Sequence, residues 1–170
     1  MTNYIDPKPL HCSMEFIREI AEILIRSTKF KVGGNIEKDI INKLGGIVHH
    51  PDTAGWDAKF AETDSLYVDG VRDFKIFLKD KLYDLRNRFT LAHELGHFIL
   101  HSKSGQIKIH ARRYGTSQIE KEANRFAAEL LMPKNELEEL FNQDKSVCEL
   151  ADIFDVSIVA MNVRIDSLRL

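Results

Sequence analysis

The chain has 170 residues, of which 44% are hydrophobic, and a formal net charge of −2 at pH 7. This length and hydrophobic content suit a single domain with its own core, and the small net charge provides no overall basic field for nucleic acid or anionic lipid. No run approaches the roughly 18 apolar residues of a membrane helix, and the N-terminal residues lack the layout of a signal peptide, so we expect a soluble, cytoplasmic protein.

The two cysteines, Cys12 and Cys148, are far apart in the sequence and form no C-x-x-C pair. This spacing indicates neither a disulfide framework nor a cysteine zinc site. We interpret both as packing or surface thiols.

The first part of the chain predicts two helices. Apolar residues recur at helical spacing from Ser13, a suitable capping residue, to about Phe30. A second helix is predicted to begin at Asn35, in the segment NIEKDIINKL. Neither segment carries residues that suggest chemistry, so we interpret both as scaffold.

From Ile47 to Leu78 the sequence consists of short apolar runs separated by turn residues, which predicts small antiparallel strands. We place them near Ile47–His49, Ser65–Val68 and Phe74–Leu78. Because proteases often bind substrate as an added strand at a sheet edge, Phe74–Leu78 is our candidate for a substrate-binding edge. His49 and His50 lie beside Pro51 in a predicted turn, where polar histidines rarely serve as ligands, and Asp84 is a candidate cap for the next helix.

The segment from Arg86 to His101, RNRFTLAHELGHFILH, carries the strongest chemical signal. At about 100° per residue, a helix places His93, Glu94 and His97 on one stripe while most of the other side is apolar. Two imidazoles one turn apart can bind one Zn²⁺, and Glu94 is then positioned as general base. The alternative is a buried helix whose histidines only hydrogen-bond carbonyl groups.

His101 is a tempting third ligand because it follows His97 by four residues. It lies eight residues from His93, however, or about 12 Å along a helix axis, which is too far to share one ion. We interpret His101 as a supporting or packing residue.

After a strand predicted near Ile107–Ala111, the segment Ser117 to Met132, SQIEKEANRFAAELLM, predicts a helix that ends at Pro133. Glu120 lies on the flank of the apolar stripe, and a half-buried carboxylate needs a cation, so we assign Glu120 as the third zinc ligand. Glu122 remains the alternative, although it is predicted to lie on a more polar flank, where its natural use is a pair with Arg125. Asn124, one turn after Glu120, faces the same way and is predicted to orient a ligand.

The donor that would stabilise an oxyanion is left open at this point. His110, Arg113 and Tyr114 are the nearest candidates in the sequence, and nothing in the sequence chooses among them.

The C-terminal residues predict two helices, Lys145–Phe154 and Ile158–Ile165, joined by a short turn. A helix, turn and helix can bind DNA. The charges of this segment are balanced rather than basic, so direct nucleic acid binding is not expected. We predict a domain border after residue 133, with residues 134–170 as a helical extension packed on a domain of residues 1–133.

The two motifs RFTLAHELGHFILH and EKEANRFAAELLMP together resemble the ImmA/IrrE family of metallopeptidases. The resemblance implies an α+β fold, zincin-like, with a small, mostly antiparallel sheet, a central H-E-x-x-H helix and a helix-turn-helix-like C-terminal segment. It also implies a gluzincin-type site, with His93, His97 and Glu120 on Zn²⁺ and Glu94 as general base.

The resemblance further implies a protein substrate, namely a helix-turn-helix transcriptional repressor or an antitoxin. The leading hypothesis is therefore a zinc-dependent endopeptidase that cleaves a regulatory protein. The alternatives are a regulator that acts by binding its repressor without cleaving it, and the toxin of a toxin-antitoxin pair.

Overall fold

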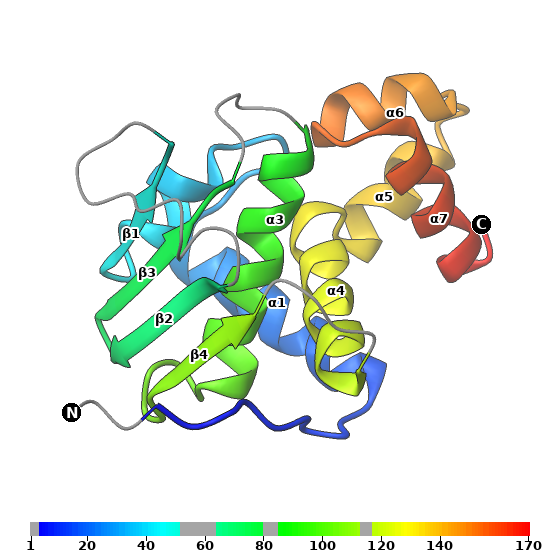
Figure 1. The fold of residues 1–170 in the computed structure, drawn as a ribbon. Coiled ribbons are helices and arrows are strands. Elements are labelled where there is room, and N and C mark those ends of the chain that lie inside the picture. The colour runs from blue at the N-terminus through cyan, green and yellow to red at the C-terminus, as the bar shows by residue number, and fades with distance from the viewer. Residues whose placement is uncertain (1–3, 52–63, 80–84, 113–116) are drawn as a thin grey trace.

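The computed structural model describes residues 4–51, 64–79, 85–112 and 117–170, and it shows an α+β fold in which helices cover one face of a small sheet (Figure 1). Four strands form the sheet: β1 (Gly46–His49), β2 (Asp64–Gly70), β3 (Asp73–Phe77) and β4 (Ile109–Arg112). The strand order is β1-β3-β2-β4, with β1 parallel to β3 and the other two pairs antiparallel. The sheet is thus mixed but mostly antiparallel, as predicted.

The strand β3 is not an edge strand, so the prediction of a substrate-binding edge at Phe74–Leu78 is wrong. The reason is that β1 pairs in parallel with β3 on the side opposite β2, where Gly46 lies across from Phe74. The edges belong to β1 and β4, and the N-terminal segment reaches β4 through a bridge between Ile5 and Ile109.

Three helices pack beside the sheet, and one of them has a side-chain cap at its N-terminus. Helix α1 (Met14–Thr28) begins at Ser13, whose hydroxyl accepts the Phe16 N–H at 3.1 Å, as predicted. Helix α3 (Leu85–Gly96) continues directly into a π-helical turn, η2 (His97–His101). Helix α4 (Gln118–Leu131) lies against both α1 and α3 (Figure 1).

The remaining helical elements frame this core. The predicted helix after Asn35 is a short π-helical turn, η1 (Glu37–Ile41), where the Asn35 carboxamide accepts the Lys38 N–H at 2.9 Å. The C-terminal helices are α5 (Lys134–Phe141), α6 (Val147–Phe154) and α7 (Ile158–Leu168). They lie on the side of α3 and α4 away from the sheet (Figure 1). No helix among the described residues has the length and apolar character needed to cross a membrane.

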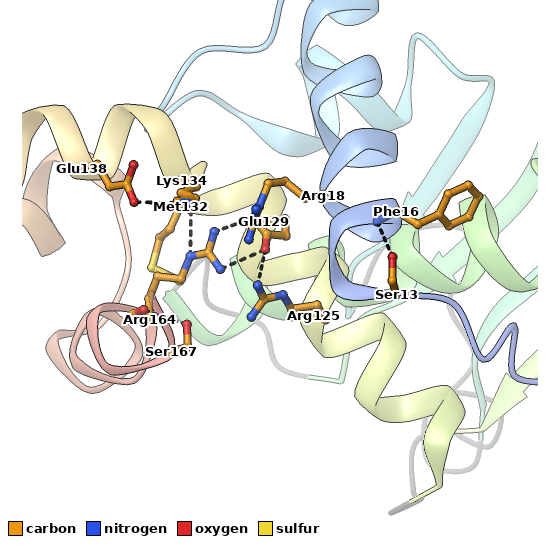
Figure 2. Close-up of polar contacts among 10 residues, drawn as sticks. All are labelled: Ser13, Phe16, Arg18, Arg125, Glu129, Met132, Lys134, Glu138, Arg164 and Ser167. Carbon is orange, nitrogen blue, oxygen red and sulfur yellow. Dashed lines mark hydrogen bonds and ion pairs between the residues drawn. The ribbon is translucent and has the colours of Figure 1, made fainter. Parts of the chain in front are cut away.

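A buried ion cluster joins the C-terminal helices to the core. Figure 2 shows Arg18 of α1, Arg125 of α4 and Arg164 of α7 around the carboxylate of Glu129. Both Glu129 and Arg164 are 1% exposed, and Arg164 Nε also donates to the Met132 carbonyl oxygen. Desolvation and the two neighbouring guanidinium groups lower the pKa of Arg125 despite its contact with Glu129, so Glu129 is the carboxylate on which the three cations depend.

Replacement of Glu129 by alanine is therefore expected to destabilise the fold by about 3–5 kcal/mol, because it leaves buried guanidinium groups without a counter-charge. Urea denaturation followed by circular dichroism measures the change. The matched control is Glu139→Ala on α5, where the side chain is exposed, and a change within about 0.5 kcal/mol is expected. Equal stabilities of the two variants would contradict a structural role for the cluster.

Candidate metal centre

Three side chains from two separate segments converge beside α3. His93 lies on α3, His97 opens the π-turn η2, and Glu120 lies in the first turn of α4. The two Nε2 atoms of His93 and His97 are 3.1 Å apart. Glu120 Oε2 lies 3.1 Å from His93 Nε2, and Glu120 Oε1 lies 3.5 Å from His97 Nε2. The sequence-predicted ligand trio is thus brought together in space.

The spacing of these atoms fits a tetrahedral zinc site. Ligand atoms at about 2.0–2.1 Å from a tetrahedral Zn²⁺ lie roughly 3.3–3.4 Å from one another. The two Nε2 atoms are 3.1 Å apart, and the nearest Glu120 oxygens lie 3.1 Å from His93 Nε2 and 3.5 Å from His97 Nε2, so these contacts fall on either side of this value. Two imidazoles and one carboxylate are also a donor set that catalytic zinc sites use, so these residues fit the metal.

The two helices that carry the trio approach closely because of a glycine. A Cβ atom built on Gly96 would lie 3.2 Å from the Cα of Ala123 in α4 and 3.2 Å from the ring of Phe126. Glycine and alanine therefore let the two backbones meet next to His97. On the other side, the rings of Phe98 and Phe74 stack with centroids 3.9 Å apart, which fixes η2 against β3 of the sheet.

The charges of the trio favour an ionised carboxylate. Burial raises the pKa of Glu120, but hydrogen bonds with His93 and His97 outweigh it and lower that pKa to about 2. For His93, burial acts in the opposite direction and lowers the pKa. The contact of His93 with Glu120 and the charge of Glu94 outweigh burial, so the net shift raises the pKa of His93. The carboxylate is thus held in the anionic form that binds a cation.

Asn124 lies where the sequence predicted it. Its Oδ1 is 2.8 Å from Nδ1 of His93. Because a carboxamide oxygen only accepts, His93 Nδ1 carries a proton in this bond, and in the neutral ring Nε2 then keeps a lone pair. Asn124 therefore turns the nitrogen of His93 that faces His97 and Glu120 into a potential ligand.

Glu94 lies beside this group and is 4% exposed. Its Oε2 atom is buried without a hydrogen-bond partner among the described residues. An unpaired buried carboxylate oxygen is costly unless a water, substrate or proton completes it. The position therefore suits a group that exchanges a proton with a molecule entering the site.

Several other candidates lie away from this cluster. His49 stacks on Phe77, and His50 Nε2 contacts Glu37 at 2.9 Å.

His110 pairs across the sheet with Tyr67, between the buried positions Ile109 and Ala111. The side chain of His110 thus faces away from the helices, which removes it as an oxyanion donor. Asp84, Arg113 and Tyr114 lie outside the described residues.

The prediction that Glu122 lies on a polar flank and pairs with Arg125 is wrong. Glu122 is 2% exposed, and Arg125 pairs instead with Glu129. Glu122 accepts the Leu10 N–H at 2.9 Å and the His11 N–H at 2.8 Å. The missed signal is spacing, because Glu122, Phe126 and Glu129 follow one another at intervals of four and three and share the buried face.

His101 is buried between the trio and Glu122. Its Nδ1 lies 3.0 Å from Nδ1 of His97, and its Nε2 lies 3.0 Å from Glu122 Oε2. Burial lowers the pKa of His101 in spite of the carboxylate. Burial raises the pKa of Glu122, but the amide of Leu10, His101 and the amide of His11 outweigh it, and the net shift is downward. His101 therefore contacts a member of the trio without joining it.

Comparison with known proteins agrees with this geometry. Residues 48–166 match the family Peptidase_M78, described as the IrrE N-terminal-like domain. The match covers more than half of the chain, so the protein belongs to this family, as its two motifs predicted. The family is one of metallopeptidases, which implies a metal and peptidase activity. No curated protein gives a significant match.

Replacement of Glu120 by glutamine is expected to weaken zinc binding by more than about 100-fold, because it removes the anionic donor while keeping the side-chain size. Metal analysis after dialysis, together with a chelator competition, measures the change. The control Glu139→Gln alters an exposed glutamate on α5 and is expected to bind zinc as the wild type does. Undiminished zinc affinity in Glu120→Gln would remove Glu120 from the ligand set.

Proposed function

We propose that the protein is a zinc-dependent endopeptidase, with His93, His97 and Glu120 as metal ligands and Glu94 as general base. The observation that carries this proposal is the convergence of two imidazole Nε2 atoms and the carboxylate of Glu120, with contacts of 3.1–3.5 Å, close to Glu94, which has a buried, unpartnered oxygen. Membership of a peptidase family supports the same reaction class.

Each residue contributes a defined task to this chemistry. A zinc ion held by the trio would supply Lewis acidity, which lowers the pKa of water toward about 7 and polarises a carbonyl group. Glu94 accepts the proton of the attacking water at its unpartnered Oε2 and later delivers it to the leaving amine. Asn124 keeps His93 Nε2 unprotonated by accepting from Nδ1. His97 is buried, while His93 and Glu120 are partly exposed, so the metal position is open to a water molecule and a substrate.

We further propose that the substrate is a regulatory protein in the cytoplasm, such as a helix-turn-helix repressor. The resemblance of both motifs to the ImmA/IrrE family supports this substrate class. Both cysteines are unpaired in the structure, which agrees with a reducing compartment.

A cleavage assay with Glu94→Gln tests the proposed reaction. The probe is a purified candidate helix-turn-helix repressor, and products are detected by mass spectrometry. Cleavage is expected to fall by about 10²–10⁴-fold, the usual contribution of general acid–base catalysis, while zinc content stays the same because Glu94 is no ligand.

The control for this assay is Glu139→Gln, which is expected to cleave at the wild-type rate. Equal cleavage by Glu94→Gln, or cleavage that persists after zinc is removed with a chelator, would contradict the proposal. Relief of repression without any cleavage, unchanged in Glu94→Gln, would instead support a regulator that acts by binding.

A further inference from the structure

In the proposed reaction, His97 binds the metal through Nε2. The two buried side chains on the Nδ1 side of the ring, His101 and Glu122, have no role in that reaction. His101 and Glu122 are 4% and 2% exposed, and burying two titratable side chains is costly unless they have a fixed partner. Both belong to one continuous chain of contacts that starts at His97. That chain runs away from the trio toward the N-terminal segment.

The contacts of Glu122 fix the direction of the hydrogen bonds. The Leu10 and His11 backbone N–H groups can only donate, so both carboxylate oxygens act as acceptors. Glu122 Oε2 also contacts His101 Nε2 at 3.0 Å. A carboxylate that already accepts amide protons accepts here too, so His101 Nε2 is the donor.

The direction then passes through the His101 ring to His97. With its proton on Nε2, a neutral His101 has a lone pair on Nδ1. That atom lies 3.0 Å from Nδ1 of His97, which must therefore donate. The proton of His97 is thus placed on Nδ1, and Nε2 keeps its lone pair, facing His93 at 3.1 Å.

The π-turn and the N-terminal segment make this arrangement possible. His97 and His101 are the first and last residues of η2, and their rings contact each other through the two Nδ1 atoms. At the other end, the N-terminal segment is anchored by the Ile5–Ile109 bridge and by Tyr4, whose hydroxyl donates to Asp69 at 2.7 Å.

We propose that His101 and Glu122 are positioning residues that lock His97 in the zinc-binding tautomer, with the backbone of residues 10–11 holding the far end of the chain. The proposal rests on the metal centre of the proposed function. It also gives a role to residues 10–11, which lie before the family match because that match begins at residue 48.

The test is the zinc affinity of His101→Leu, measured by chelator competition without substrate. Leucine fills a similar space but neither accepts from His97 nor donates to Glu122, so affinity is expected to fall by about 10–100-fold, as for other outer partners of metal-bound histidines. Glu122→Gln is expected to weaken zinc in the same range. The matched control His49→Leu changes a histidine that stacks on Phe77 and should leave affinity unchanged.

Long-range ¹⁵N NMR of the zinc-loaded wild type gives a second readout that does not depend on any variant folding. The expected result is a proton on Nδ1 of His97 and on Nε2 of His101. A proton on Nδ1 of His101, or wild-type zinc affinity in a folded His101→Leu, would overturn the proposal.

These outcomes are separable from failure of the proposed reaction. Zinc binding with the expected tautomers but without peptide cleavage would refute the endopeptidase and leave the positioning role standing. A wild-type protein that binds no zinc would refute both.

Discussion

The close approach of α3 and α4 at Gly96 and Ala123 is the constraint on which the site depends. A side chain at position 96 would have to fit within 3.2 Å of the opposing backbone, so the crossing is set by the absence of a Cβ atom. Because His97 follows Gly96 directly and Glu120 lies one turn before Ala123, this contact brings imidazole and carboxylate together. Candidate metal ligands that are far apart in the sequence thus meet where two helical segments cross.

Helix α4 carries three glutamates with ionic or hydrogen-bonded partners, and each glutamate has partners of a different kind. Glu120 pairs with two histidines, Glu122 with backbone amides and His101, and Glu129 with three arginines. Only the first group has the donor set and spacing that suit a metal ion. The other two are completed by the protein itself, which makes them structural supports on either side of the site.

Much of this fold follows from local sequence patterns. Helical spacing and the caps at Ser13 and Asn35 predicted the helices, and the alternation of apolar runs with turn residues predicted the strands. Helical geometry also predicted that Glu120 and Asn124 face the same way, and the structure brings both to the histidines. These features depend on neighbours within a few residues, so the sequence alone shows them.

The features that the sequence did not show depend on distant contacts. The parallel pairing of β1 with β3, which makes β3 an inner strand, links residues almost 30 positions apart. The π-turn at His97–His101 has no composition signal of its own. The burial of Glu122 could have been read from its spacing to Phe126, but its partners Leu10 and His11 lie more than 100 residues earlier.

X-ray absorption at the zinc K-edge of the zinc-loaded protein identifies the atoms around the metal and so examines the ligand set itself. Coordination by His93, His97 and Glu120 should give nitrogen and oxygen neighbours at about 2.0–2.1 Å with the scattering pattern of two imidazoles. A sulfur neighbour near 2.3 Å, which would point to Cys12 or Cys148, or a spectrum with fewer than two imidazoles, would contradict it.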